Sequence, residues 1–258
     1  MNNHLPITKS NVQHIQQLQK EKNYRSTHAS FVIEGEKWVN FALDNYPHLV
    51  RIIVGTREWY TNNKTVSEEE EITPITYYFI KDIELNRIST QKTPNKVVAV
   101  LDIPSTDTTL TPAPKGITLV IDNMNDPGNF GTIIRLSGWF GIQQIVCSEQ
   151  TVDCYNPKVV QATMGSLLGI SITYTDLATY LANTTLPVYA ADMKGDTLAQ
   201  IKFPEACIIL IGQESNGLSA DLYPHITQRI HIPSAPSTEV ESLNVGMAAS
   251  IICYEFYR

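Results

Sequence analysis

Residues 117–147, ITLVIDNMNDPGNFGTIIRLSGWFGIQQIVC, decide the fold class of this chain. They contain an apolar strand at 118–121, a polar turn with Asp-Pro-Gly-Asn, an apolar helix at 130–140 and a second strand at 144–147. The alternation continues toward the C-terminus, with strands expected at 171–174, 188–191, 207–211 and 229–232 and helices at 157–168, 176–183, 218–225 and 243–257. Apolar strands separated by helices are typical of a parallel sheet that is covered on both faces. The sequence therefore predicts an α/β domain built on a parallel sheet.

The N-terminal part has its own alternation of helices and strands. We expect helices at 11–22, 36–45 and 81–88 and strands at 31–33, 50–54, 76–80 and 97–101. Between the two parts, Pro104, Pro112 and Pro114 stand among Ser, Thr and Asp residues, a composition typical of an extended connector. The sequence thus predicts a smaller N-terminal α/β domain at 1–103, a linker at 104–116 and a larger domain at 117–258.

The overall composition indicates a globular protein. Of the 258 residues, 43% are hydrophobic and 17% are charged, which excludes disordered and collagen-like chains. No apolar run approaches the roughly 20 residues of a membrane span, and the N-terminus lacks a secretory signal. The four cysteines form no C-x-x-C pair, and Cys147, Cys207 and Cys253 stand among apolar residues. We interpret them as reduced core thiols of a cytoplasmic protein.

Charge is distributed unevenly along the chain. Residues 1–104 carry 12 basic and 12 acidic side chains, and four of the acidic ones form the run from Glu68 to Glu71. Residues 105–258 carry 7 basic and 14 acidic side chains, which accounts for the net charge of −7. A polyanion partner would therefore meet the N-terminal part first. The acidic C-terminal part argues against a protein whose main role is to coat nucleic acid through bulk charge.

Three polar segments follow predicted strands, at the edge where open parallel sheets bind ligands. They are 122–131, 211–218, and 230–233 together with 241–245. Each also has a purely structural interpretation. The first is a tight turn, the second a strand-ending turn whose Ser215 or Asn216 caps the next helix, and the third an N-cap. Simple N-capping explains one of Ser242 and Asn244, but it does not easily explain both.

Arg135 is the most unusual residue of the helix that follows the first segment. It lies within the apolar run Ile133-Ile134-Arg135-Leu136, and Gly131 and Gly138 share its helix face. Small residues around an arginine let a ligand or another backbone approach it closely. The alternative interpretation is a buried structural ion pair.

Several familiar motifs are absent from the sequence. There is no G-x-G-x-x-G, Walker A loop, G-x-S-x-G or H-E-x-x-H, and the six histidines show no metal-ligand spacing. A nicotinamide-dependent oxidoreductase on a doubly wound sheet is therefore disfavoured, and we expect no metal site.

The three segments, in this order, resemble the motifs of the SpoU/TrmH family of RNA 2′-O-ribose methyltransferases, in the SPOUT superfamily. The matching stretches are NDPGNFGTIIR (125–135), IGQESNGL (211–218), and IP (232–233) with ESLNV (241–245). The N-terminal part is similar, more weakly, to the family's L30e-like substrate-binding domain, through FVIEG (31–35) and VVAV (97–100). The resemblance implies a C-terminal trefoil knot, a homodimer and S-adenosylmethionine bound by the knot loops.

The resemblance also assigns residues. By motif position, S-adenosylmethionine would lie near Ala190, Gly212, Ile232 and Leu243. The matching catalytic positions are Asn129, Arg135, Glu214, Ser242 and Asn244. Arginine normally stays protonated, with a pKa above about 12. We therefore expect Arg135 to position the substrate and stabilise charge, for instance by clamping a phosphate, rather than to act as a base.

The sequence departs from the family pattern in two places. Ser215 stands where the family usually has Gly, and a longer link, beginning Ser234-Ala235-Pro236, follows Ile232-Pro233 where the family usually has Met. The expected function is transfer of a methyl group from S-adenosylmethionine to a ribose 2′-OH of rRNA or tRNA. The alternative is a catalytically inactive RNA-binding dimer of the same fold.

Overall fold

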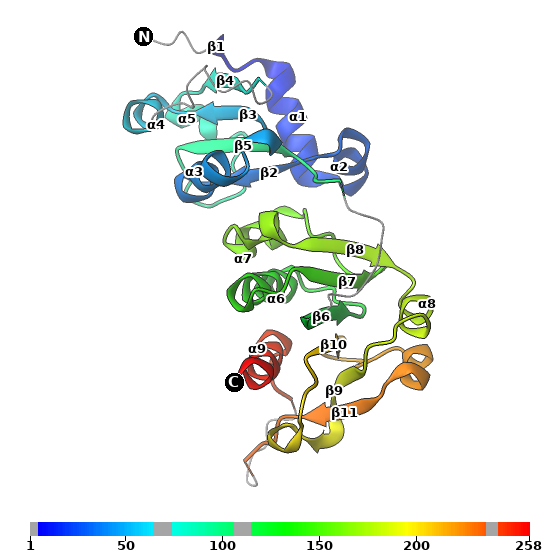
Figure 1. Cartoon of the computed structure of the whole chain (residues 1–258). Helices are drawn as coiled ribbons and strands as arrows, with labels where there is room; N and C mark the ends of the chain where they lie inside the picture. The colour runs from blue at the N-terminus through cyan, green and yellow to red at the C-terminus, as the bar shows by residue number, and fades with distance from the viewer. Residues whose placement is uncertain (1–4, 64–73, 106–114, 236–241) are drawn as a thin grey trace. The chain divides into compact units, whose positions relative to one another are not determined.

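The computed structural model describes residues 5–63, 74–105, 115–235 and 242–258. The chain divides into two compact units. The N-terminal unit consists of Met1–Ser105 together with Tyr155–Leu168, and the C-terminal unit consists of Thr106–Cys154 and Gly169–Arg258. The segment 155–168, which the sequence analysis placed in the second domain, thus groups with the N-terminal unit. Each unit contains its own sheet (Figure 1).

A mixed five-stranded sheet forms the centre of the N-terminal unit. Its order is β1-β4-β3-β5-β2. The strands are β1 (Leu5–Pro6), β4 (Thr76–Phe79), β3 (Val50–Gly55), β5 (Val97–Asp102) and β2 (Ser30–Glu34). β1, β4 and β3 are parallel, whereas β5 runs antiparallel to both β3 and β2. Predicted strands at 31–33, 50–54, 76–80 and 97–101 are therefore confirmed, to within one residue at their ends.

Helices cover both faces of this sheet. They are α1 (Lys9–Lys20), α2 (Lys22–His28), α3 (Glu36–Asn45), the 3-10 turn η1 (Pro47–Leu49), α4 (Arg57–Asn62), α5 (Asp82–Leu85) and α7 (Pro157–Thr163). Ile15 and Leu18 of α1 share a buried cluster with Val32 and Val98 of the sheet. Helix α3 contacts β2 and β5. Side chains that alternate with Val32 along β2, such as the buried Phe31, point to the face of the sheet opposite α1.

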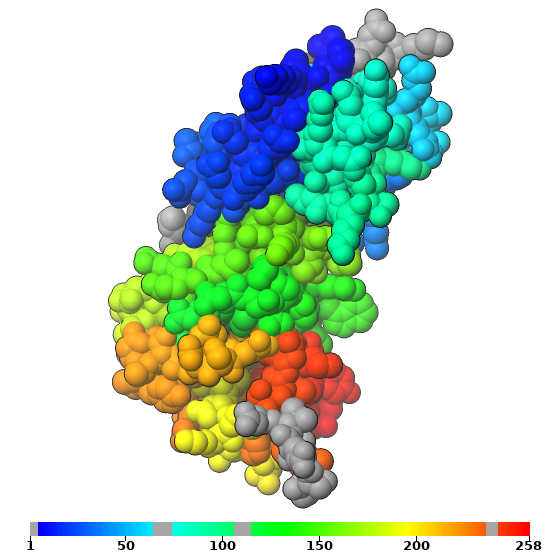
Figure 2. All heavy atoms as spheres, turned by 180° about the vertical axis from the view of Figure 1, so that it is seen from behind, coloured from blue at the N-terminus to red at the C-terminus, as the bar shows by residue number. Residues whose placement is uncertain are grey.

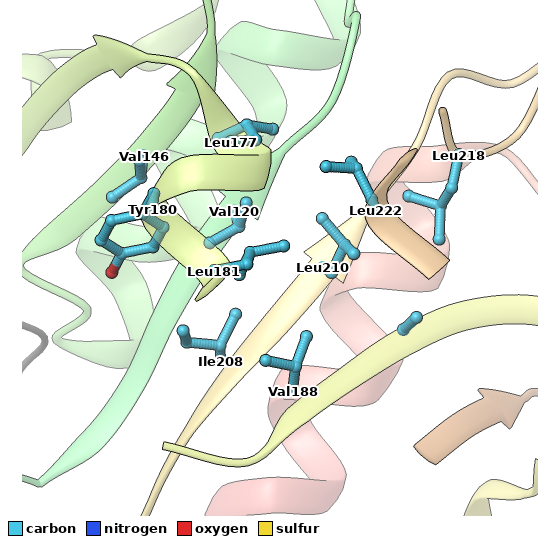
Figure 3. Close-up of a cluster of buried hydrophobic side chains, with 11 residues drawn as sticks. Val120, Val146, Leu177, Tyr180, Leu181, Val188, Ile208, Leu210, Leu218 and Leu222 are labelled. Carbon is cyan, nitrogen blue, oxygen red and sulfur yellow. The ribbon is translucent and has the colours of Figure 1, made fainter. Parts of the chain in front are cut away.

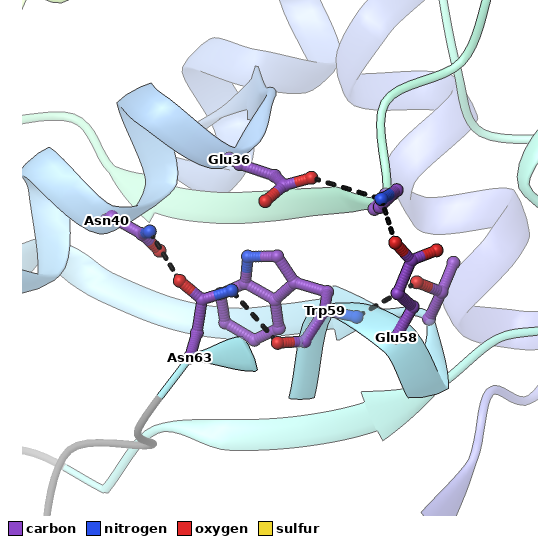
Figure 4. A network of polar contacts seen from close by, with 7 residues as sticks. Glu36, Asn40, Glu58, Trp59 and Asn63 are labelled. Atoms are coloured by element: carbon purple, nitrogen blue, oxygen red, sulfur yellow. Dashed lines mark hydrogen bonds and ion pairs between the residues drawn. The ribbon is translucent and has the colours of Figure 1, made fainter. Parts of the chain in front are cut away.

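A polar network ties α4 to its neighbours around the fully buried Trp59 (Figure 4). The Asn63 amide donates to the carbonyl of Trp59 (2.9 Å) and accepts from Asn40 of α3 (2.6 Å). Lys96 forms an ion pair with Glu58 and a longer one, 4.0 Å, with Glu36. These charges are partly exposed, so the pairs contribute little to stability, and burial of the indole dominates.

The C-terminal unit contains a six-stranded, fully parallel sheet of order β11-β9-β10-β6-β7-β8. The strands are β6 (Gly116–Ile121), β7 (Gln144–Ser148), β8 (Ser171–Thr175), β9 (Val188–Thr197), β10 (Ala206–Ile211) and β11 (Gln228–His231). All six predicted strands and the predicted parallel direction are confirmed. β9 is longer than expected because its pairing with β11 shifts: Arg229 pairs with Ala190, but the next residue, Ile230, pairs with Asp196.

Side chains alternate between the two covered faces of this sheet. On one face, Val120, Ile208 and Leu210 meet α8 (Leu177–Ala182) and the 3-10 helix η4 (Ala220–His225), as Figure 3 shows. On the other face lie α6 (Pro127–Phe140) and α9 (Val245–Tyr257), which contact each other. The short 3-10 turns η2 (Ser166–Gly169) and η3 (Leu198–Gln200) are the remaining helical elements of the described residues. No described helix is both long and apolar enough to cross a membrane.

Several predicted helices differ in length or type. The helix expected at 11–22 ends at Lys20, because Glu21 is extended (φ −118°, ψ 116°), and a second helix, α2, begins at Lys22. The helix expected at 81–88 is only α5, and the one expected at 218–225 is the 3-10 helix η4. Pro224 lies inside η4 and cannot donate the hydrogen bond that an α-helix needs there. The predicted linker and the Glu68–Glu71 run lie mostly or wholly outside the described residues.

Candidate active site in the C-terminal unit

Three residues from distant parts of the chain meet at the carboxyl end of the central strands. The Asn129 amide donates to Glu214 Oε1 (2.9 Å), and the Asn244 amide donates to Asn129 Oδ1 (2.9 Å) and to Glu214 Oε1 (3.1 Å). β6 and β10 are paired in register up to Ile121 and Ile211, so the loops after them start side by side. The predicted convergence of the three segments is therefore present, and we call Asn129, Glu214 and Asn244 the polar triad.

The start of α6 places Asn129. Asp126 is the N-cap, and its carboxylate accepts a hydrogen bond from the backbone N–H of Asn129 (2.7 Å). Pro127 occupies the first helical turn, where its fixed φ suits the helix and its missing N–H costs nothing. The Asp-Pro-Gly-Asn turn thus has a structural role, and it also presents the Asn129 side chain toward the other two loops.

A tight turn after β10 places Glu214. The backbones of Gln213 and Gly217 exchange two hydrogen bonds, Gln213 N to Gly217 O (3.0 Å) and Gly217 N to Gln213 O (2.9 Å). Gly217 has a positive φ of 68°, and a Cβ on Gly212 would lie 2.5 Å from the Gly217 oxygen. Both glycines are therefore required by the turn itself. Ser215 and Asn216 do not cap η4; Asn216 instead donates to Gln213 Oε1 (2.8 Å).

Asn244 has two roles at the start of α9. Its Oδ1 caps the helix by accepting from the N–H groups of Gly246 (3.0 Å) and Met247 (3.3 Å), so the N-cap interpretation is confirmed for this residue. Its amide nitrogen donates to the polar triad. The N–H of Val245 also donates to Glu214 Oε1 (3.3 Å). The carboxylate therefore lies at the N-terminus of α9, where backbone N–H groups point toward it.

A second polar cluster, formed after strands β6, β7 and β10, is not predicted from the sequence. The buried Asp122 carboxylate accepts from the backbone N–H of Ser219 (2.7 Å) and from the Asn123 amide (3.0 Å). Asn123 also donates to Ser219 Oγ (2.9 Å) and, through its backbone, to Ser148 Oγ (2.8 Å). These bonds fix the loops after β6, β7 and β10 to one another. The signal that could have found them is a carboxylate directly after a buried strand.

Two predicted catalytic residues stand apart from these contacts. Arg135 is exposed on α6, about 9 Å along the helix from Asn129 at 1.5 Å per residue, and within the described residues it has no hydrogen bond or ion pair. The buried ion-pair interpretation of Arg135 is therefore wrong. Ser242 is also exposed, and its side chain bonds to no residue in the described part of the chain. Glu241 lies outside the described residues.

The positions expected to hold S-adenosylmethionine lie on or just after neighbouring strands. Ala190 is buried in β9 opposite Leu210 of β10, Gly212 follows β10, and Ile232 follows β11. Leu243 is 44% exposed, and Gly212 and Ile232 are half-buried. Apolar side chains at loop ends beside polar groups suit an adenosine-type ligand. The residues present therefore fit the cofactor. Among the described residues, no group of three His, Cys, Asp or Glu side chains could hold a metal ion.

Comparison with protein families gives two matches. The model of the SpoU rRNA Methylase family matches residues 116–254, and the model of the MRM3-like substrate binding domain matches residues 9–99. A curated relative, the 23S rRNA (guanosine(2553)-2′-O)-methyltransferase of Bacillus subtilis, is 28% identical over 248 residues. That alignment covers 92% of this chain and 95% of the relative.

Solved structures of RNA methyltransferases are similar to nearly the whole chain. A putative RNA methyltransferase of the TrmH family from Porphyromonas gingivalis has a TM-score of 0.83 and 33% identity, with 97% of this chain and 98% of that chain covered. An AdoMet-bound rRNA methyltransferase from Sinorhizobium meliloti also has a TM-score of 0.83, with 25% identity and coverage of 98% and 95%.

Proposed function

The chain belongs to the SpoU rRNA methylase family, and we propose from this premise how its residues carry out the reaction. The protein is an RNA methyltransferase that transfers a methyl group from S-adenosylmethionine to a ribose 2′-OH. The observation that supports the assignment to particular residues is the meeting of Asn129, Glu214 and Asn244, one from each motif. The inactive RNA-binding dimer is not favoured by any contact in the site.

The polar triad orients the reactants. When bound, S-adenosylmethionine supplies a methyl carbon on a sulfonium that already carries positive charge. Because displacement at a carbon requires closely aligned reacting atoms, positioning is the main contribution of the chain. Glu214 Oε1 is held by three donors, whereas its Oε2 has no hydrogen bond to a described residue. We assign Glu214 Oε2 to a hydrogen-bond donor of the bound ligand, with Asn129 and Asn244 fixing its direction.

Arg135 acts as a positioning and charge-stabilising group. Its guanidinium is exposed and has no described partner, so it is available to a phosphate beside the target ribose. An exposed arginine stays protonated at any physiological pH, which argues against a role as base. The 2′-OH restricts the substrate to RNA. Ser242, exposed just before the polar triad's Asn244, is assigned to ordering this loop or contacting the nucleotide.

The test of this assignment uses variants Arg135→Ala, Arg135→Lys and Glu214→Ala. Radiolabel transfer from S-adenosylmethionine to RNA is measured, with cofactor binding measured separately by calorimetry. We expect the arginine variants to lose at least about 10-fold in transfer while still binding the cofactor, because Lys lacks the bidentate fork. Near-normal turnover in either arginine variant contradicts the assignment of Arg135. Absence of both binding and transfer in the natural chain contradicts the proposed mechanism as a whole.

We also propose a homodimer through α6 and α9 and a C-terminal trefoil knot, both of which the resemblance to the family implies. Met247, Ile251 and Tyr254 of α9 form a stripe at helical spacing and are 60%, 40% and 60% exposed, and Trp139 of α6 is 85% exposed. Helix α9 is seen in red in Figure 2. Apolar side chains grouped on two adjoining helices are typical of an interface. Arg135 lies one helical turn from Trp139 on α6. We propose, as the resemblance to the family implies, that the active site is shared between the two subunits.

The dimer is tested by Ile251→Asp, with Ile83→Asp as the matched control. Ile83 is 82% exposed, but it lies alone on α5 of the N-terminal unit. Sedimentation at micromolar concentration should give a dimer for the natural chain and the control and a monomer for Ile251→Asp, because a buried unpaired carboxylate is strongly unfavourable. A monomeric natural chain overturns this part of the proposal.

The target RNA is rRNA or tRNA, and the named relatives favour rRNA. Mapping 2′-O-methylation in RNA from cells that lack this protein identifies the RNA and the nucleotide. We also propose that the protein works in the cytoplasm, since its four cysteines are buried as free thiols, as expected in a reducing compartment.

A further inference from the structure

A cavity of about 340 Å³ lies within the N-terminal unit, and no residue of the polar triad lines it. It is bounded by the end of β2, the start of α3, the loop 90–95 and the segment 157–168. All of these belong to the same compact unit. The volume falls within the range of small-ligand sites, roughly 300–1,000 Å³. Nothing in the proposed methyl-transfer mechanism uses this cavity.

Two amide side chains face the cavity and leave a donor and an acceptor unused. The Asn95 amide nitrogen donates to Gln91 Oε1 (2.7 Å). This bond leaves one N–H₂ group and one C=O group without a partner among the described residues, whichever way the two amides are turned. Gln161 of α7 also lines the cavity, and its side chain has no hydrogen bond to any described residue either. An adjacent donor and acceptor match the Watson–Crick edge of a nucleobase.

Glu34 fixes the loop that carries these amides. Its carboxylate accepts hydrogen bonds from the Ser89 hydroxyl, from the backbone and hydroxyl of Thr90 (3.1 and 3.3 Å) and from the backbone of Asn95 (3.4 Å). The charge of Glu34 is therefore directed into the loop. A loop held at both ends by one carboxylate presents Gln91 and Asn95 in a fixed geometry, which lowers the entropic cost of binding a ligand.

The other wall of the cavity is apolar and strained. Trp38 lies so close to Gly165 that a Cβ there would come within 2.5 Å of the indole, and Lys37 lies over the same ring at 4.7 Å. Met164, the residue before, has a left-handed backbone (φ 52°) although it is not glycine, and its side chain is 43% exposed. Such strain in a residue with a bulky side chain is found at ligand sites more often than elsewhere. An exposed thioether beside an aromatic ring provides an adaptable apolar surface.

We propose that this cavity binds one unstacked nucleobase of the RNA substrate and so contributes to the choice of target. The inference rests on the proposed function, since it takes RNA as the ligand. Single-stranded RNA is recognised by bases splayed out against apolar or aromatic side chains and bonded along their edges. Lys37 lines the cavity, and Lys92 directly follows Gln91, which also lines it; both lysines are exposed and available to the phosphates that flank such a base. The Gln91–Asn95 pair reads the base edge, and Met164 and Trp38 contact its face.

The experiment uses the full chain and short single-stranded RNA oligonucleotides that carry 4-thiouridine, with an RNA duplex of equal length for comparison. Affinity is measured by fluorescence anisotropy at fixed salt for the natural chain, for Gln91→Ala/Asn95→Ala and for Gln161→Ala. The matched control is Gln13→Ala/Gln17→Ala, which removes two exposed amides from α1, away from the cavity. Ultraviolet crosslinks are mapped by mass spectrometry, and thermal melting reports whether each variant is folded.

We expect the Gln91/Asn95 variant to bind single strands roughly 10-fold more weakly, the size expected for loss of base-edge hydrogen bonds, with no change for the control. Crosslinks should fall on residues 31–38, 90–95 or 157–168, and S-adenosylmethionine binding should be unchanged. Unchanged RNA affinity in this variant, or crosslinks confined to the C-terminal unit, overturns the inference even if methyl transfer is normal. If the double variant melts at a lower temperature than the natural chain, the inference is tested by the RNA affinity of Gln161→Ala and by the crosslinks of the natural chain. If the natural chain transfers no methyl group although its crosslinks fall on the cavity, the result counts against the proposed mechanism and not against this inference.

Discussion

Asn244 shows how one side chain can serve the fold and the site at once. Its oxygen caps α9 and its nitrogen joins the polar triad. The two roles can be separated by substitution. Ser at this position keeps an oxygen that can cap the helix, whereas Ala removes both functions. We expect Asn244→Ala to lower the free energy of unfolding by about 1 kcal/mol more than Asn244→Ser, because an N-cap contributes about that much. Both variants should lose methyl transfer to a similar degree.

The control for this pair is another N-cap of the same unit. Asp176 caps α8 by accepting from the N–H of Thr179 (2.7 Å) and makes no contact with the polar triad. Asp176→Ala should therefore lower stability in urea titration while leaving methyl transfer per folded molecule unchanged. Near-normal transfer by Asn244→Ser would show that the amide nitrogen of Asn244 is not needed for the reaction.

The sequence predicts the residues of the site better than their contacts. The three motifs identified Asn129, Glu214 and Asn244, which the structure brings within hydrogen-bonding distance. Arg135 was also singled out, but its exposure could not be known, since an apolar helix can bury a face against its own sheet or leave one for another subunit. The sequence does not predict the role of Asp122, because only the folded sheet places the N–H of Ser219 beside it.

Among the elements, strands were predictable and short helices were not. The short apolar runs of β6, β7 and β10 are buried on both faces, as is typical of strands in a covered parallel sheet. Short segments such as α4 and β1 carry too few residues to show a period. They form because tertiary contacts select them, as the buried Trp59 does for α4.

The contact between α6 and α9 includes a close approach at Gly246. A Cβ on Gly246 would lie 3.0 Å from Cγ2 of Thr132. Gly246→Ala gains helix propensity but crowds this methyl group, whereas Thr132→Ser removes the methyl and keeps the hydroxyl that donates to Gly128 (2.9 Å). We expect Gly246→Ala to be more stable in the Thr132→Ser background than in the natural one, with a coupling energy of about 0.5–2 kcal/mol. Chemical denaturation of the four chains of the cycle measures it, and strictly additive effects would rule out the steric contact.

At the scale of the whole molecule, the two sheets were not equally predictable. The parallel direction of the C-terminal sheet follows from helices between its strands, since each crossover returns the chain to the same edge. In the N-terminal sheet β5 runs antiparallel to both of its neighbours, β3 and β2. The loop before β5 lies at the end of the sheet where β2 and β3 finish, so the chain runs back in the opposite direction. Similarly, no local pattern places 155–168 with the N-terminal unit, since its grouping depends on contacts such as Phe31 with Tyr155 (ring centroids 4.7 Å apart).

All four cysteines are buried, so the free energy of unfolding at alkaline pH depends on thiols from several parts of the fold. Burial raises the pKa of Cys207 and Cys253 from 9.0 to about 12, and raises that of Cys147 well above 9.0. Between the unfolded and folded pKa values the unfolded chain releases protons that the folded chain keeps. The free energy of unfolding should therefore fall as the pH rises above about 9, whereas near pH 8 the thiols have no such effect. Urea titrations at several pH values measure this decline.

The same burial predicts that the native thiols are unreactive. At pH 8 the folded chain should take up less than about one equivalent of an alkylating reagent in the time that the urea-unfolded chain reacts at all four cysteines, since only an accessible thiolate is a nucleophile. The variant Ala182→Cys, at an exposed position in α8, is the matched control and should add one rapidly reacting thiol. If a natural cysteine reacts as fast as this reporter, that thiol is reached by solvent in the native state. The raised pKa of that thiol would then be wrong. Its contribution to the loss of stability at alkaline pH would be wrong as well.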